Sequence, residues 1–147
     1  MRRESRRRRV SSRKRSSLRE RQLPLCRVLQ PQEGVPADSA GVVLIRQLQE
    51  FRPGRYAFSI LAHNLPAPEE MGSFDQYQGL VFIPEVITWV FALYPTPETP
   101  PTWAGTLTQS TLDPTPLGIA QVRLVHSKEE TVGPIVLQAR LSGDLRQ

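Results

Sequence analysis

Proline interrupts this chain so often that strands and turns are favoured over long helices. The sequence holds 14 prolines and nine glycines among 147 residues. Proline lacks a backbone N–H and disrupts a helix interior, and both residue types are common in turns. We therefore expect one domain with tails, built from strands and loops.

Between these breaks, apolar residues recur at every second position, which is the period of a β-strand. The clearest alternation lies at residues 56–62, 86–94 and 135–141, and further strands are expected at 41–51, 81–83, 103–112 and 122–126. One helical turn is expected at residues 74–78. Six or seven strands with little helix predict an all-β, antiparallel sandwich or barrel.

Charge divides the chain into two unequal parts. Residues 1–27 contain 12 Lys/Arg and two Asp/Glu, whereas residues 28–147 contain seven Lys/Arg and 12 Asp/Glu. Residues 1–27, here called the cationic arm, are too polar to bury enough surface to offset the entropy of ordering, so we expect disorder. Residues 28–40 are expected to be a linker, and residues 41–147 the β-rich domain.

The cationic arm is the strongest functional signal. Seven of its cations lie within residues 6–15, and guanidinium groups pair with phosphate oxygens in bidentate fashion. The arm contains no aromatic residue, so we expect neutralisation of the phosphate backbone rather than base stacking. A nuclear import signal, read by import receptors, is the alternative and is compatible with it. The candidate nucleic-acid-binding residues are Arg2, Arg3, Arg6, Arg7, Arg8, Arg9, Arg13, Lys14, Arg15, Arg19 and Arg21.

Residue types that carry catalysis or bind metals are few. Cys26 is the only cysteine, and His63 and His126 are the only histidines. They cannot form the usual four-ligand zinc site, and neither histidine has a flanking catalytic motif. We expect no enzyme activity, no metal and no cofactor. The longest apolar run, residues 79–95, is interrupted by Pro84 and is short for a membrane span, so no membrane partner is expected.

Glu69, Glu70 and Asp75 form a small acidic group beside a loop. We expect a solvated loop here, with a calcium site or a subunit contact as the alternatives. Trp89 and Trp103 are expected in the core or an interface.

The middle of the chain resembles the single-jelly-roll coat proteins of small icosahedral viruses, which include circovirus-like, small plant RNA and satellite viruses. The resemblance covers about sixty residues and the arm, and no element of it is diagnostic alone. It rests on an aromatic strand at 56–60, Leu65 and Pro66, the FDQY element at 74–77, a hydrophobic strand at 86–95, and a Thr- and Asp-containing segment at 103–113.

This resemblance implies a viral capsid protein with an eight-stranded jelly roll that assembles into a shell in the virion. The arm would touch an RNA or single-stranded DNA genome, in the host nucleus or cytoplasm before packaging. The chain departs from the family in extra apolar residues at 79–84 and in ending 34 residues after Asp113. Either the barrel is compressed or its last strands are missing.

Two other functions are compatible with the same residues. One is a nuclear regulatory protein that binds a structured RNA through the Arg-rich motif. The other is a β-rich interaction module whose basic tail serves nuclear import alone.

Overall fold

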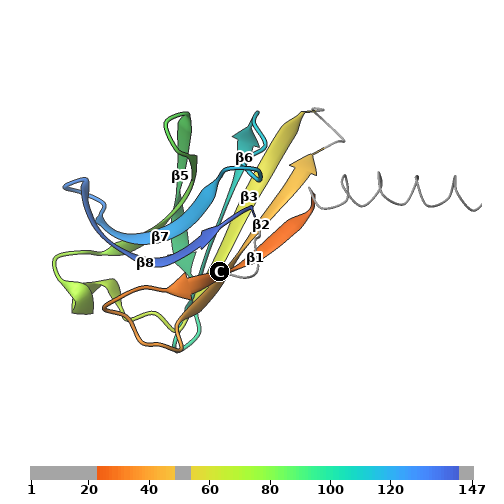
Figure 1. The fold of residues 1–147 in the computed structure, drawn as a ribbon. Coiled ribbons are helices and arrows are strands. Elements are labelled where there is room, and N and C mark those ends of the chain that lie inside the picture. The colour runs from red at the N-terminus through yellow and green to blue at the C-terminus, as the bar shows by residue number, and fades with distance from the viewer. Residues whose placement is uncertain (1–22, 49–53, 143–147) are drawn as a thin grey trace, which may run out of the picture.

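The alternating segments of the sequence become strands in the computed structural model, which describes residues 23–48 and 54–142 (Figure 1). One 3-10 helical turn, η1 (Pro68–Met71), is present within these ranges. The strands are β1 (Leu25–Pro31), β2 (Ala40–Leu48), β3 (Arg55–His63), β4 (Gln76–Ile83), β5 (Ile87–Pro95), β6 (Thr102–Ser110), β7 (Ile119–His126) and β8 (Thr131–Arg140).

These eight strands form a closed, fully antiparallel barrel. The order around it is β1-β2-β3-β6-β5-β4-β7-β8, and β8 pairs with β1. Strands β4, β5 and β6 follow one another as hairpins, while β3 lies beside β6 and β7 lies beside β4. Each of those two neighbours completes a Greek key. The predicted all-β, jelly-roll-like fold is confirmed, and the barrel is closed rather than lacking its last strands.

Two strands carry the chain from one sheet of the barrel to the other. Sheet A contains β1, β2, β3, β6 and the end of β5, and sheet B contains β4, β5, β7, β8 and the end of β1. In β1, Leu25–Leu29 pair with β2, whereas Gln30 and Pro31 pair with β8. Strand β5 does the same with Tyr94 and Pro95, which pair with β6. The strands of the two sheets therefore cross (Figure 1).

Large side chains from both sheets fill the barrel interior. The rings of Phe58 in sheet A and Trp89 in sheet B meet edge to face with centroids 5.0 Å apart, as do those of Tyr77 and Trp103. The Tyr77 hydroxyl donates a hydrogen bond of 2.7 Å to the carbonyl oxygen of Pro66, so the buried phenol is satisfied. Both tryptophans contribute to the core, as predicted. Its fully buried members include Leu29, Val43, Ile45, Ile60, Leu93, Val122, Leu124 and Leu137.

The structure corrects the boundary between arm and domain. Strand β1 includes residues 25–27 of the predicted arm and residues 28–31 of the predicted linker, so those assignments are wrong at these positions. Leu25 and Leu29 alternate into the core, and their burial stabilises β1 as the strand that closes the barrel. The predicted disorder of residues 1–22 lies outside the described residues.

Two smaller predictions are also wrong. No helical turn forms at residues 74–78: residues 74 and 75 end the β3–β4 connection, and residues 76–78 begin β4, where Tyr77 is buried in the core. The sequence suggested six or seven strands where eight are present. None of the helical structure in the described ranges is long and apolar enough to cross a membrane.

Candidate nucleic-acid interface

All eleven candidate nucleic-acid-binding residues lie within residues 1–22, outside the described residues. This segment holds eleven Lys/Arg and two Asp/Glu, a formal charge of +9. The described chain begins at Leu23, immediately after it, and enters β1 at Leu25. The charge of the barrel surface near this entry therefore decides whether the barrel assists or opposes the binding of a polyanion.

Strand alternation places the described termini at the same end of the barrel. Each strand runs opposite to its neighbours, and β1 and β8 are the first and last of an even number of strands. We call this the arm end, and it also carries the β2–β3, β4–β5 and β6–β7 connections. The opposite end, here called the acidic end, carries the β1–β2, β3–β4, β5–β6 and β7–β8 connections.

The arm end of the described barrel is mildly cationic. Four arginines lie in the parts of their strands nearest this end: Arg27 in β1, Arg46 in β2, Arg55 in β3 and Arg140 in β8. Two carboxylates, Glu85 and Asp113, lie in the connections at this end. The described residues of the arm end thus carry a formal charge of +2.

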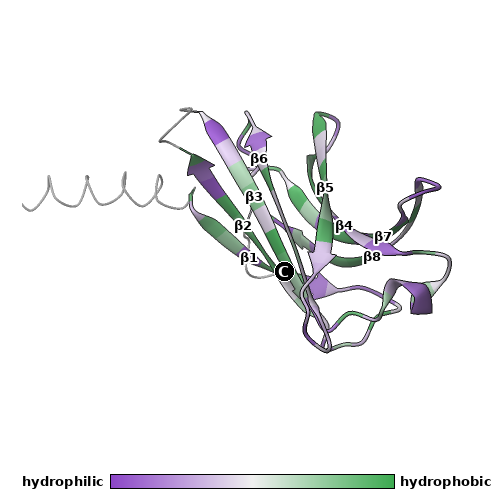
Figure 2. Ribbon diagram, turned by 180° about the vertical axis from the view of Figure 1, so that it is seen from behind, coloured by the Kyte–Doolittle hydropathy of each residue, from purple (hydrophilic) through white to green (hydrophobic). Residues whose placement is uncertain are grey.

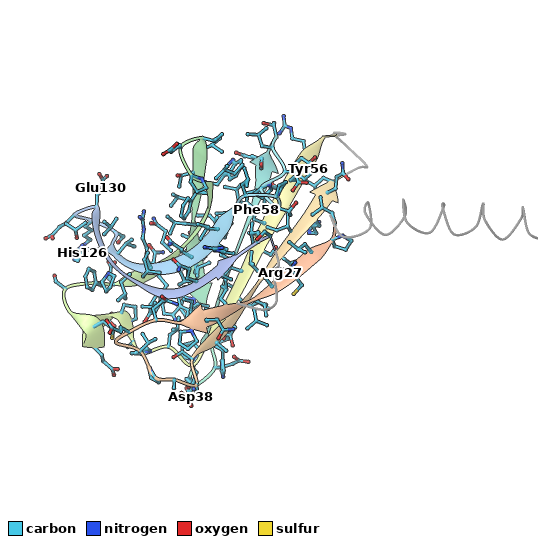
Figure 3. The ribbon with its side chains drawn as sticks, in the orientation of Figure 1. Arg27, Asp38, Tyr56, Phe58, His126 and Glu130 are labelled. Carbon is cyan, nitrogen blue, oxygen red and sulfur yellow. The ribbon has the colours of Figure 1, made fainter. Side chains whose placement is uncertain are left out.

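The other end of the barrel carries most of the negative charge. Lys128 is the cation in its described loops, whose formal charge is −7. Figure 3 shows Asp38 and Glu130 projecting from the barrel well away from Arg27. The exposed carboxylates of these loops belong to Glu33, Asp38, Glu69, Glu70, Asp75, Glu98, Glu129 and Glu130.

Hydrophilic colour on β2 and β3 is concentrated where these strands reach the arm end (Figure 2). Coulomb attraction between exposed charges falls off over roughly 8 Å at physiological salt. The described residues therefore differ in formal charge between the two ends, which is positive at the arm end and negative at the acidic end.

The sequence did not single out the four barrel arginines as a group. They are scattered between positions 27 and 140 and share no local motif. Only the antiparallel order of the strands brings them to one end. Knowing whether each arginine lies on an odd- or an even-numbered strand would therefore have been needed to predict the group. With eight strands, odd-numbered strands begin at the arm end and even-numbered strands finish there.

Arg123 is a different kind of cation, because it is partly buried on β7 of sheet B. Its Nε donates a 2.8 Å hydrogen bond to Oε1 of Gln78 on the neighbouring strand β4. Partial burial lowers the pKa of the guanidinium. A shallow hollow of about 270 Å³ lies here, and Glu130 and His126 also line it. The nearby carboxylate makes this hollow less suited to a phosphate than the arm end.

Asp75 links two connections at the acidic end, the one before β4 and the one after β7. Its carboxylate accepts a 2.8 Å bond from the backbone N–H of Ser127 and a 2.7 Å bond from the Ser127 hydroxyl. These bonds lower the pKa of Asp75. Within the described ranges, no group of three or more His, Cys, Asp or Glu side chains is placed to hold a metal ion. The two hydrogen bonds give Asp75 a structural role, because they join the residue before β4 to the residue after β7.

We expect Asp75→Asn to destabilise the protein near pH 7 and to do so less in acid. The folded-state pKa of Asp75 lies below its unfolded value of about 3.9, so its stabilisation is present above that pH. It is lost as the pH falls through the lower, folded-state pKa. Urea unfolding of both proteins from about pH 7 to pH 2.5 measures the difference.

The matched control for this prediction is Ser127→Ala, which removes the hydroxyl donor and leaves the backbone donor. Its loss should be smaller, and the double variant should lose less than the sum of the two single variants. A stability difference between wild type and Asp75→Asn that stays constant across the pH range would contradict the assignment.

The comparisons with known proteins extend over most of the barrel. A family model described as the SPbeta prophage-derived uncharacterized protein YoqH matches residues 21–144. The chain belongs to the YoqH family. A curated relative of the same description, from Bacillus subtilis (strain 168), is 37% identical over 118 residues, which cover 78% of each chain. No solved structure matches the chain.

The match to the YoqH family begins at residue 21, so it includes the barrel and excludes most of the cationic arm. The family relationship therefore concerns the strands and their connections. Ten of the eleven candidate nucleic-acid-binding residues precede the matched segment, and Arg21 is its first residue.

Proposed function

We propose that this chain is a nucleic-acid-binding protein of phage origin, and that residues 1–22 neutralise phosphates while the barrel holds copies of the protein together. The observation that carries the proposal is the segregation of charge. A segment of charge +9 joins the barrel at its cationic end, and the charge of −7 lies in the loops of the opposite end. This polarity orients the barrel with its arm end toward a polyanion.

The chemistry requires only positioning and charge. Arginine side chains pair with phosphate oxygens and stay charged at physiological pH. Each phosphate contact releases condensed counterions, so binding gains entropy and weakens as the salt concentration rises. Many arms on one strand of nucleic acid raise the effective concentration of each neighbour, so binding becomes cooperative without any new contact.

The specific form of the proposal is a coat protein that packages a genome. The relative in Bacillus subtilis is described as prophage-derived, which supports a phage origin. A closed barrel of eight strands leaves few free strand edges, which suits a body that must be packed side by side without aggregating. The two alternative functions, a nuclear regulatory protein that binds RNA and an interaction module with a nuclear import signal, stay predictions. The barrel residues favour neither of them.

The test is the salt dependence of binding to single-stranded RNA and DNA by the full chain. If about six arm cations contact phosphates, the slope of log K against log salt should be near −4. A chain lacking residues 1–22 should bind far more weakly with a much shallower slope. Equal binding by that shorter chain would refute the proposal.

Electron microscopy of the protein with bulk nucleic acid separates the coat protein from other nucleic-acid-binding proteins. Shells of uniform diameter would support the coat role. Small discrete complexes with selectivity for one RNA shape would favour a regulator and would overturn the coat role, while leaving phosphate binding by the arm intact.

A further inference from the structure

Five apolar side chains form one row across the outer face of sheet A. Val28 pairs with Val42 and Val42 with Leu61; Leu61 pairs in turn with Ala104, and Ala104 with Tyr94. Val28, Leu61 and Tyr94 are 57%, 49% and 62% exposed. Because directly opposite residues on neighbouring strands touch, the row is a continuous strip roughly 20 Å long.

The two rows beside this strip consist of uncharged residues, and the Thr102 hydroxyl of one row also donates a 3.3 Å hydrogen bond to the carboxylate of Glu98 at its edge. On one side, the hydroxyls of Ser59 and Thr106 share a 3.0 Å hydrogen bond. On the other, Nδ1 of His63 and the hydroxyl of Thr102 lie 3.1 Å apart in a hydrogen bond. None of the described residues in the three rows is Asp, Glu, Lys or Arg.

A contiguous exposed apolar patch with polar residues at its rim is a common feature of protein interaction sites. Isolated exposed apolar residues need no explanation, but a strip that crosses five strands without a charge does. Figure 2 shows hydrophobic colour along β1 and much of β2 and β3, the strands on which the strip begins. An apolar centre with polar flanks is also the usual arrangement of a protein–protein interface.

We propose that this face of sheet A packs against the same face of a second copy of the chain, forming a two-fold dimer. Strands β2, β3 and β6 have nine residues each. With Leu25–Leu29 of β1 and with Tyr94 and Pro95 of β5, the face of sheet A comprises 34 residues. At about 3.4 Å per residue and about 4.8 Å per strand, it covers about 550 Å². Two copies would bury about 1,100 Å², just above the roughly 1,000 Å² expected of a specific interface.

The shape and charge of the strip favour a second copy over a different partner. Leu61 is the middle residue of the five, so a two-fold axis in the plane of the face through Leu61 lays the strip on itself. The strip and the two rows beside it contain no charged residue that would repel its own copy, and Arg46 and Arg55 lie toward the arm-end margin of the face. The centre of the contact involves neither the cationic arm nor these arginines, so it can be tested in the absence of nucleic acid.

Sedimentation velocity of the full chain, after nuclease treatment and in about 1 M NaCl, tests the dimer without bridging by nucleic acid. We expect the wild type to be a dimer at micromolar concentration. Leu61→Lys should weaken dimerisation on the order of 100-fold, because two lysines would meet unpaired at the axis. Leu117→Lys is the matched control, since Leu117 is 72% exposed in the β6–β7 connection. It should leave the dimer unchanged.

A second pair of variants, one in the strip and one outside it, separates loss of the dimer from loss of the fold. Val28→Lys changes the end of the strip, and Val132→Lys changes a valine of almost equal exposure, 58%, on β8. Circular dichroism identifies the variants that keep the barrel. The proposal is overturned if the wild type is a monomer, or if folded strip variants and controls dissociate alike. Nucleic-acid binding measured on the same samples shows whether the proposed function fails separately.

Discussion

Replacing the seven cations between residues 6 and 15 with glutamine is expected to lower the affinity for single-stranded nucleic acid by about 10⁴-fold at about 0.1 M salt. Each phosphate contact to a single strand contributes about 0.7 to the salt slope, so about six lost contacts remove about four decades of affinity relative to 1 M salt. The substituted residues are Arg6, Arg7, Arg8, Arg9, Arg13, Lys14 and Arg15. Fluorescence anisotropy with a labelled oligonucleotide measures both affinity and slope.

The control for charge is a variant in which the six arginines of this group become lysines. It keeps every positive charge and loses bidentate geometry, so its salt slope should stay near that of the wild type. A glutamine variant that retains the wild-type slope would mean that phosphates are neutralised elsewhere. The arm-end arginines of the barrel would then be the first residues to test.

Replacing Phe58 with alanine is expected to reduce the free energy of unfolding by about 3–5 kcal/mol, the usual range for a fully buried phenylalanine. Phe58 has no exposed surface, and its ring contacts Trp89 across the barrel interior. Truncation removes the transfer free energy of the ring and leaves a cavity between the two sheets. Urea denaturation monitored by circular dichroism measures the loss.

Two further variants serve as controls for the loss of stability expected of Phe58→Ala. Phe58→Leu keeps most of the volume and should cost clearly less. Leu117→Ala removes an exposed side chain and should change stability by about 0.5 kcal/mol or less. If Phe58→Ala cost less than about 1 kcal/mol, the packing of Phe58 between the sheets would be contradicted.

The strands that sequence predicted best are those with unbroken alternation. Residues 56–62 lie within β3, residues 135–141 lie within β8 except for the last, and residues 86–94 nearly coincide with β5. The β5 pattern predicts a common face of Ile87, Trp89, Phe91 and Leu93; the last three point into the core, whereas Ile87 at the start of the strand is 37% exposed. Period-two patterning succeeds here because one face of each strand packs inside the barrel.

Strand β1 was not predicted because its sequence combines the alternating leucines of a strand with the positive charge of the preceding segment. Leu25 and Leu29 alternate toward the core, but Arg27 lies between them and the highly cationic segment directly precedes them. Neither leucine would be buried by a short isolated segment. Pairing with β2 on one side and with β8 on the other supplies the partner surface, and that pairing spans more than 100 residues of sequence.

The residues of the candidate functional site also divide into those that the sequence shows and those that only the fold brings together. The eleven cations of residues 1–22 are visible in sequence because they are contiguous, and charge density along the chain needs no fold to be read. The arginines of the arm end and the strip on sheet A are each assembled from strands far apart in the chain. Their members share no sequence neighbourhood that a pattern could detect.

The sequence by itself determined that this protein is all-β, because alternation and proline act over a few residues, and that its positive charge is concentrated near one terminus. Only the tertiary structure decided that the barrel closes, that its charges separate to opposite ends, and that one outer face is left apolar. These three properties depend on which strands become neighbours. That choice follows from burying all eight apolar faces together, not from any one of them.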